Sequence, residues 1–382
     1  MNPIPMLDLK RHYEYMKLDI DAAIDKCLEH QQWIKGPEVR ELEEKIAEYL
    51  NVKHCVGVAS GTDALVIALR TLAIRITGKE YFNREDEIIT TPFTFVATGD
   101  AILRAGATPV FVDIDPQTLN IDPGAISAYL ENEPSQVAGI LPVHLYGNAC
   151  DMDAIMDIAQ EKSLFVLEDA AQALGCAWGG KKVGGIGDAS TLSFFPSKNL
   201  GGFGDGGMFV TNDNDLADIA KMLIQHGGKD KYNSEHIGYN SRLDTLQAAV
   251  LLAKSKYLEE MNGLRRNLAS VYNEHLQEID QVLPLQPLQK SYSVYNQYTV
   301  LVNEKRRNEL AEHLKTKGIS TSVYYERPLH MMNTFTEKMK LGVVPKRAET
   351  AAKQVLSLPI EPFLKTEQIK HVTEGIANFL EG

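Results

Sequence analysis

The sequence predicts an α/β fold with a mostly parallel sheet, and two observations lead to this prediction. From Cys55 onward, short apolar runs alternate with stretches of helical periodicity. Several of these runs are apolar throughout, as in strands that are covered on both faces. Such runs, joined by helices, are typical of an open α/β domain. The predicted strands are residues 55–58, 87–90, 108–112, 139–143, 164–167, 189–194 and 208–211.

The segment before the first strand is predicted to be helical. Between residues 15 and 50, apolar residues such as Val39, Leu42 and Ile46 recur at a spacing that places them on one side of a helix. The loop at residues 33–37 interrupts this pattern, so we expect two helices.

The remainder of the chain predicts a second, smaller domain. Residues 243–276 contain no proline and only Gly263 as a glycine, which predicts one long helix connecting two domains. Beyond it we expect a strand and two helices, at residues 295–302, 305–317 and 346–356. The predicted division is a large α/β domain at residues 1–250 and a small α+β domain at residues 251–382.

Composition excludes several classes of protein. The 382 residues carry a formal net charge of -12 without a run of Lys or Arg, which argues against binding of nucleic acid. The 4 cysteines form no C-x-x-C pair, so we expect neither a disulfide framework nor a metal site. No segment reads as a signal peptide or approaches the ~20 apolar residues that span a bilayer. We therefore expect a cytoplasmic protein with no membrane partner.

Polar residues follow three of the predicted strands, where ligands of open α/β sheets bind. Ser60, Gly61 and Thr62 open a helix after the first strand, and free N–H groups at such a position bind anions. The alternative is an ordinary helix cap. Asp169 follows the strand at 164–167. A buried carboxylate there either caps backbone donors or keeps the pyridine nitrogen of pyridoxal 5'-phosphate (PLP) protonated.

Lys198 follows the strand at 189–194 and is surrounded by small residues and glycines. By itself it could be a loop lysine. A lysine that bonds PLP, however, needs such a partly desolvated and reachable position. The order of anion loop, carboxylate and lysine along the chain therefore predicts a PLP site.

The sequence resembles the DegT/StrS family of PLP-dependent nucleotide-sugar aminotransferases. The matching motifs run in order from about residue 7 to residue 330. They are Gly-Pro-Glu-Val (36–39), Ser-Gly-Thr-Asp-Ala-Leu (60–65), Pro-Phe-Thr-Phe-Val-Ala (92–97), Val-His-Leu-Tyr-Gly (143–147), Glu-Asp-Ala-Ala-Gln-Ala (168–173), Ser-Phe-Phe-Pro-Ser-Lys-Asn-Leu-Gly (193–201), Gly-Asp-Gly-Gly (204–207) and the segment 240–249.

The resemblance implies the fold-type I aminotransferase architecture and a homodimer with shared active sites. It implies that Lys198 forms the imine with PLP and transfers the substrate proton. The other implied cofactor contacts are Asp169 to the pyridine nitrogen, Gln172 near the phenolic oxygen, Phe95 stacked on the ring, Gly61, Thr62 and Ser193 on the phosphate, and Asn240 on the phosphate across the interface. Phe95 could instead be a core residue, and Asn240 a helix cap.

The resemblance also suggests substrate contacts for Lys35, His236, Tyr324 and His330. A lone histidine such as His330 is as often structural. The other histidines, including His144 and His226, are predicted to be structural or surface groups.

The implied reaction transfers an amino group from L-glutamate to a nucleotide-linked oxo-sugar. The Lys-Asn-Leu-Gly and Gly-Asp-Gly-Gly motifs resemble members that act at C-3. Candidate substrates are UDP-2-acetamido-2-deoxy-3-oxo-glucuronate and a dTDP-3-oxo-6-deoxyhexose. His236 stands where members acting on the uronate tend to carry an arginine that would grip its carboxylate. Three alternatives remain: action at C-4, an amino-acid-metabolising PLP enzyme, and a non-catalytic regulator.

Overall fold

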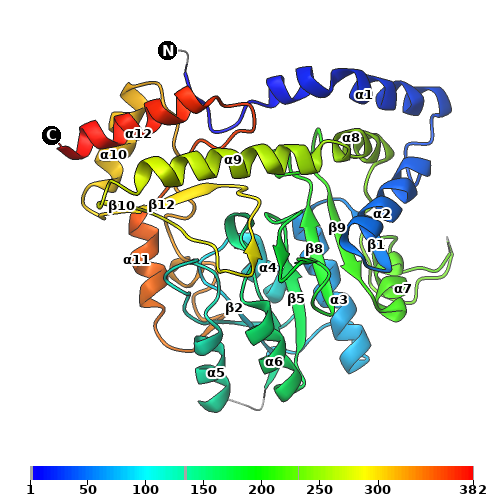
Figure 1. Ribbon diagram of the computed structural model, residues 1–382. Helices are drawn as coiled ribbons and strands as arrows, with labels where there is room; N and C mark the ends of the chain where they lie inside the picture. Colours follow the sequence, from blue (N-terminus) through cyan, green and yellow to red (C-terminus); the bar gives the residue numbers. More distant parts are fainter. Residues whose placement is uncertain (1–2, 133–135, 231, 382) are drawn as a thin grey trace.

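The structure is a computed structural model that describes residues 3–132, 136–230 and 232–381 (Figure 1). In these residues the largest sheet has eight strands in the order β1-β9-β8-β5-β4-β2-β3-β13. Neighbours from β13 to β8 pair in parallel, whereas β9 is antiparallel to both β8 and β1. The mostly parallel sheet confirms the predicted fold class. Its strands are β1 (His54–Val58), β2 (Glu87–Thr90), β3 (Thr108–Phe111), β4 (Val137–Leu141), β5 (Phe165–Asp169), β8 (Ala189–Ser193), β9 (Gly207–Thr211) and β13 (Lys340–Leu341).

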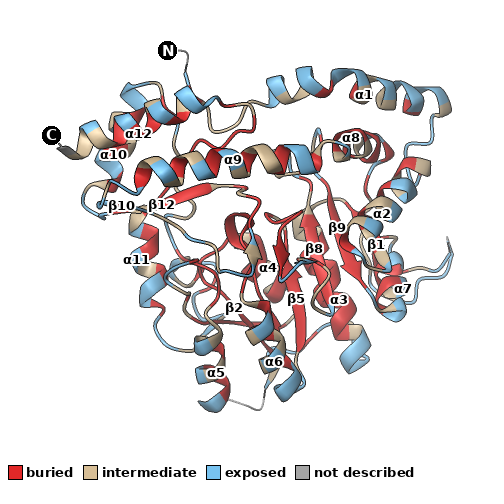
Figure 2. Ribbon diagram, viewed as in Figure 1, coloured by how far each residue is buried: buried red, intermediate tan, exposed pale blue. Residues whose placement is uncertain are grey.

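Helices cover both faces of this sheet, so most residues of its central strands are buried (Figure 2). Val166 of β5 packs into a core formed with α2, α5 and α6, whereas its neighbours Phe165 and Leu167 pack into a core formed with α3, α4 and α7. Two apolar faces explain why the strand sequences do not alternate with polar residues. The helices are α1 (Leu9–His30), α2 (Pro37–Leu50), α3 (Gly61–Thr77), α4 (Val96–Arg104), α5 (Pro123–Asn132), α6 (Met152–Lys162), α7 (Asn214–Leu223), α8 (Thr245–Ser255) and the short 3-10 turn η1 (Leu145–Gly147).

The C-terminal part is built around a three-stranded antiparallel sheet, β10-β12-β14, with its own apolar core. A third small sheet joins β11 to β6 and β7. The remaining elements are β6 (Ala177–Trp178), β7 (Lys181–Lys182), α9 (Leu258–Leu276), β10 (Val282–Pro284), β11 (Ser291–Tyr292), β12 (Tyr298–Val302), α10 (Arg307–Thr316), η2 (Leu329–Met331), α11 (Lys346–Gln354), β14 (Val355–Leu358) and α12 (Thr366–Glu381).

The prediction of one long helix at 243–276 is wrong. The segment forms α8 and α9, separated by Lys256 and Tyr257. Both side chains bind Asp19 of α1, the lysine through an ion pair and the tyrosine through a hydrogen bond of 2.5 Å. Contact with α1 therefore accompanies the break, which no Pro or Gly marks in the sequence. The predicted helix at 346–356 also ends early, because Val355 begins β14.

The division at residue 250 stays a prediction. In the described residues, three backbone pairings connect its two sides. Ile4 forms a bridge with Ile319, β11 pairs with β6, and β13 extends the large sheet beside β3. In the described part of the chain no helix is long and apolar enough to cross a membrane.

Candidate active site

The loop after β1 meets the end of β8. Ser60 caps α3, and its hydroxyl accepts a hydrogen bond from the Asp63 N–H (3.1 Å). A Cβ atom at Gly61 would lie only 2.7 Å from the Cβ of Ser193, so the two loops are packed as closely as a glycine allows. The first N–H groups of α3, including that of Thr62, have no partner within the helix. N–H groups in this position can bind an anion, and the Ser193 hydroxyl lies beside them.

Asp169 ends β5 beside β8 and is 5% exposed. Its carboxylate accepts hydrogen bonds from the Thr98 hydroxyl (2.9 Å) and the Ala171 N–H (3.2 Å). Burial raises the pKa of Asp169, although these bonds and the charge of Lys198 oppose the rise. A buried carboxylate of this kind is stabilised by a cationic ligand.

The adjacent carboxylate, Glu168, has a different environment. It is fully buried and accepts hydrogen bonds from the N–H groups of Gly184, Ile186 and Gly187, each at 2.8 Å, and pairs with His144 Nε2 at 3.0 Å. Burial disfavours the charged form, yet these donors hold the pKa of Glu168 below its ordinary value. The hydrogen-bonding capacity of Glu168 is thus filled by groups of the protein. His144 is one of these groups and is structural, as predicted.

Lys198 lies in the turn after β8, where its backbone N–H donates to the carbonyl of Phe195 (2.8 Å). Burial lowers the pKa of Lys198, and the negative charge of Asp169 partly opposes this shift. A larger fraction of the amine is therefore neutral, which is the nucleophilic form. The structure brings Lys198, Asp169, Ser193 and Gly61 to the carboxyl edge of the sheet.

Aromatic and amide groups surround this edge. Gln172 accepts a hydrogen bond from the Tyr146 N–H (2.7 Å) and donates one to the Tyr325 hydroxyl (3.1 Å). The Tyr146 hydroxyl in turn donates to the carbonyl of Tyr324. Phe95 is 54% exposed, with its ring centroid 6.3 Å from that of Tyr325, so it is not a core residue. Its free face can stack on a planar ring.

Lys35 and Asn240, two further predicted residues, meet at Gln225. The Lys35 amine donates to Gln225 Oε1 (2.5 Å), and Asn240 forms an isolated β-bridge with Gln225. Both residues are exposed, and Asn240 Oδ1 accepts a hydrogen bond from Arg242. Within the described residues of one chain, no hydrogen bond links Lys35 or Asn240 to the Lys198 turn.

The two predicted histidines are paired with carboxylates. His236 Nδ1 lies 2.7 Å from Glu80 Oε1, and Glu80 also accepts a bond from the buried Arg70 (2.8 Å). His330 Nε2 lies 3.1 Å from Glu349 Oε1 of α11. The partner of His330 is thus a residue of the protein itself.

Among the described residues, one group of possible metal ligands lies away from this site. Ligand atoms of Cys27, His30 and Glu38 lie within 4.8 Å of one another. His30 Nδ1 accepts the Gln32 N–H (3.0 Å), which places the proton of a neutral ring on Nε2, facing Glu38. Glu38 also pairs with Lys26 (3.3 Å). These contacts satisfy the carboxylate without a metal.

Sequence reasoning missed Thr98, Tyr146 and Tyr325. Thr98 lies in the first turn of α4, and only the fold brings it to Asp169. Tyr325 lies in the C-terminal part, far along the chain from Gln172. The one signal in the sequence was that Thr98 lies three residues after Phe95, a predicted cofactor contact, and so could lie near the same site.

The residues at the edge fit PLP. The tight approach at Gly61 leaves the helix N-terminus free for a phosphate, Asp169 suits a pyridinium nitrogen, and the exposed ring of Phe95 suits stacking. The fold and the fit to this cofactor place the protein in the class of PLP-dependent aminotransferases with the type I fold.

Comparison with known proteins identifies the family. The model of the DegT/DnrJ/EryC1/StrS aminotransferase family matches residues 14–377, and the chain belongs to this family. The chain is 45% identical over 379 residues to a "pleiotropic regulatory protein" of Geobacillus stearothermophilus, with 98% of each chain covered. It is 40% identical over 376 residues to the UDP-2-acetamido-2-deoxy-3-oxo-D-glucuronate aminotransferase of Pseudomonas aeruginosa, which covers 98% of this chain and 100% of that one.

A solved structure supports the same assignment. The crystal structure of NtdA from Bacillus subtilis with bound cofactor PMP, the pyridoxamine form of PLP, matches with a TM-score of 0.90 and 32% identity. The match covers 100% of this chain and 86% of that one. The protein is therefore a PLP-dependent sugar-nucleotide aminotransferase.

Proposed function

We propose that the protein transfers an amino group from L-glutamate to C-3 of a nucleotide-linked 3-oxo sugar, for polysaccharide or amino-sugar biosynthesis such as that of O-antigen. The observation that carries the proposal is the convergence of Lys198, Asp169 and the N-terminus of α3 at one sheet edge. The Lys-Asn-Leu-Gly motif after β8 supports C-3, and so does the name of the Pseudomonas aeruginosa relative.

Each residue has a proposed role. When bound, PLP supplies a ring that accepts the electron pair released at the substrate carbon. The Lys198 amine bonds the cofactor and then moves the proton at that carbon, and Asp169 keeps the ring nitrogen protonated. Gln172 lies at the phenolic oxygen and Phe95 on the ring face. Gly61, Thr62 and Ser193 hold the phosphate.

We further propose a homodimer with shared sites. Asn240 and Lys35 are exposed and lie together at Gln225, which supports their action in the site of a partner chain. Tyr324 and His330 are proposed substrate contacts from the C-terminal part.

His236 bears on the identity of the sugar. The His236 ring pairs with Glu80, which also pairs with Arg70. Because Glu80 is itself a carboxylate, His236 is poorly suited to bind the carboxylate of a sugar. This pairing favours a neutral 3-oxo sugar, such as a dTDP-3-oxo-6-deoxyhexose, over the UDP-linked uronate.

A panel of 3-oxo and 4-oxo sugar nucleotides, incubated with L-glutamate and PLP, tests the proposal. Mass spectrometry should detect an amino sugar from a 3-oxo substrate, and the Lys198→Ala variant should form none. Product from 4-oxo sugars alone would show that the position is C-4. Turnover of free keto acids alone would indicate an amino-acid aminotransferase.

The similarity to a protein named as a regulator provides a second candidate function. A cellular phenotype of gene deletion that Lys198→Ala complements fully would favour regulation without catalysis.

A further inference from the structure

The residue after Lys198 belongs to a chain of three asparagine side chains. Asn296 Nδ2 donates to Asn199 Oδ1 (2.8 Å), and Asn199 Nδ2 donates to Asn262 Oδ1 (2.6 Å). Asn262 Nδ2 then donates to the carbonyl of Leu174 (3.1 Å). The last acceptor is a carbonyl, so Asn262 must direct its NH₂ group towards Leu174 and its Oδ1 atom towards Asn199. The same reasoning fixes which way the amides of Asn199 and Asn296 point.

The three asparagines come from separate parts of the fold. Asn199 lies in the turn after β8, Asn262 lies near the start of α9, and Asn296 precedes β12. Asn262 is 1% exposed and Asn296 is 7% exposed. Because water cannot replace the lost partners of buried amides, these bonds hold the segments together more firmly than surface contacts do.

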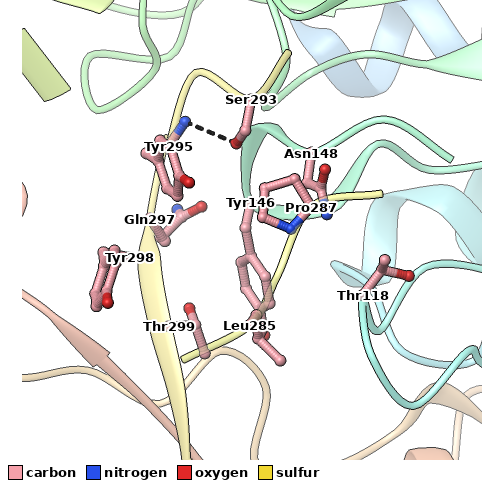
Figure 3. Close-up of a pocket in the computed structure, with 10 residues that line it drawn as sticks. All are labelled: Thr118, Tyr146, Asn148, Leu285, Pro287, Ser293, Tyr295, Gln297, Tyr298 and Thr299. Atoms are coloured by element: carbon pink, nitrogen blue, oxygen red, sulfur yellow. Dashed lines mark hydrogen bonds between the residues drawn. The ribbon is translucent and has the colours of Figure 1, made fainter. Parts of the chain in front are cut away.

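The chain of amides reaches both sides of the candidate site. At one end, Leu174 closely follows Gln172. At the other end, Asn296 belongs to a segment whose Ser293 hydroxyl donates to the carbonyl of Gly147 (2.9 Å). Figure 3 shows this segment from Ser293 to Thr299 running past Tyr146, whose N–H binds Gln172.

Both neighbours of Lys198 are held by this network. Asn296 Nδ2 also lies 3.4 Å from the carbonyl of Ser197, and Asn199 Nδ2 lies 3.3 Å from the carbonyl of Val294. The lysine side chain itself is long and flexible, so its reach is set by where the backbone holds its Cα atom.

We propose that Asn262 and Asn296 are positioning residues for Lys198, which act through Asn199 to hold the lysine turn opposite Asp169. This inference rests on the proposed role of Lys198 as the lysine that bonds PLP. The C-terminal part of the chain, through Asn296, thereby contributes to the position of a lysine that lies at the edge of the large sheet.

Variants Asn262→Ala and Asn296→Ala test the proposal. The control is Asn267→Ala, which changes an exposed asparagine of α9, the helix that holds Asn262. Two properties of the apoprotein are measured: the rate at which added PLP becomes covalently attached, and the affinity for PMP. PMP has no aldehyde and does not need the lysine amine. We expect attachment and kcat to fall about tenfold to a hundredfold in both variants, with PMP affinity retained.

Three results would overturn the proposal. Folded variants that attach PLP at the rate of the control would show that the asparagines do not position the lysine. A parallel loss of PMP affinity would show a merely structural role. If an alanine variant does not fold, Asn296→Ser replaces it, because its shorter side chain stays polar but does not reach Asn199. Attachment of PLP at the control rate in this variant would also overturn the proposal.

The proposed role of Lys198 is examined separately. Borohydride reduction of the wild-type protein with PLP, followed by peptide mapping, identifies the attached lysine. Attachment at another lysine would contradict the proposed function, independently of the asparagine variants.

Discussion

Asp169 and Glu168 are neighbours in sequence and both are buried, yet they accept different numbers of hydrogen bonds from the protein. Glu168 is surrounded by backbone N–H groups and His144, which favour its charged form. Asp169 receives a single side-chain hydrogen bond, from Thr98, and one backbone bond. The difference arises from the alternation of side chains along β5, which turns the two carboxylates to opposite faces of the sheet.

Asp169→Asn should fold but lose activity. The neutral amide cannot stabilise a protonated ring nitrogen, so we expect kcat to fall by about 10²–10³-fold, a range typical of removing one electrostatic contact in an active site. Steady-state kinetics with L-glutamate measure this. Glu168→Gln is the matched control, and it should mainly lower the melting temperature. An Asp169→Asn variant with wild-type kcat would contradict the proposed role.

Lys254 of α8 provides a prediction of pH dependence. It is 8% exposed, donates to the carbonyl of Gly201, and burial lowers its pKa to about 8. In the unfolded chain the pKa of this lysine is about 10.4. Between pH ~8 and pH ~10.4 the unfolded state therefore binds more protons than the folded state. The unfavourable contribution of Lys254 to the free energy of unfolding accordingly becomes smaller as the pH rises. Relative to the wild type, Lys254→Met should be most favoured below pH ~8 and lose this advantage towards pH ~10.

Melting temperatures of the two proteins across this pH range measure the effect. A difference that does not change with pH would show that Lys254 titrates normally in the folded protein.

At the scale of elements, the start of α3 and the end of β8 depend on one close approach. The backbone of Gly61 lies against the side chain of Ser193, and the helix dipole adds positive potential at the same point. Any side chain at residue 61 would separate the helix N-terminus from the hydroxyl beside it.

Gly61→Ala should weaken PLP binding. The new methyl group would approach Ser193 Cβ to 2.7 Å and displace the loop, and we expect the Kd of PLP to rise at least about tenfold, the equivalent of one lost hydrogen bond. Equilibrium titration of the apoprotein measures this. Gly263→Ala in α9, where the nearest atom would be 3.7 Å away, is the control and should stabilise the helix by about 1 kcal/mol. Unchanged PLP affinity in Gly61→Ala would exclude a phosphate site there.

At the scale of the whole molecule, the proposed site is divided between distant parts of the chain. Lys198 and Asp169 lie at the carboxyl edge of the large sheet, whereas Tyr325 reaches Gln172 from the C-terminal part. Asn240 and Lys35 are exposed, and each contacts Gln225 of the same chain. In the described residues neither forms a hydrogen bond with the turn that holds Lys198. A shared dimeric site would account for this separation.

Complementation between two inactive variants tests the shared site. If Asn240 acts in the site of the partner chain, a dimer of one Lys198→Ala chain and one Asn240→Ala chain has one site with both changes and one site with neither. Co-expression should therefore restore up to about a quarter of wild-type activity if the variants mix at random in equal amounts. Each variant alone serves as the control. If mixed preparations stay inactive, although gel filtration and mass spectrometry show mixed dimers, Asn240 acts in its own chain or not at all.

The sequence by itself determined the strands of the large sheet up to β9 and the order of the anion loop, Asp169 and Lys198. These features are local: several strands are uninterrupted apolar runs, and the site residues lie at a strand end or within a few residues of one. Tertiary structure alone decided the partners of those residues, including Thr98 and Tyr325, and the break between α8 and α9. Such contacts join positions far apart in the chain, and no residue period or turn signal records them. The asparagine chain at Lys198 belongs to the same group, since each of its members is an ordinary polar residue until the fold brings the three amides together.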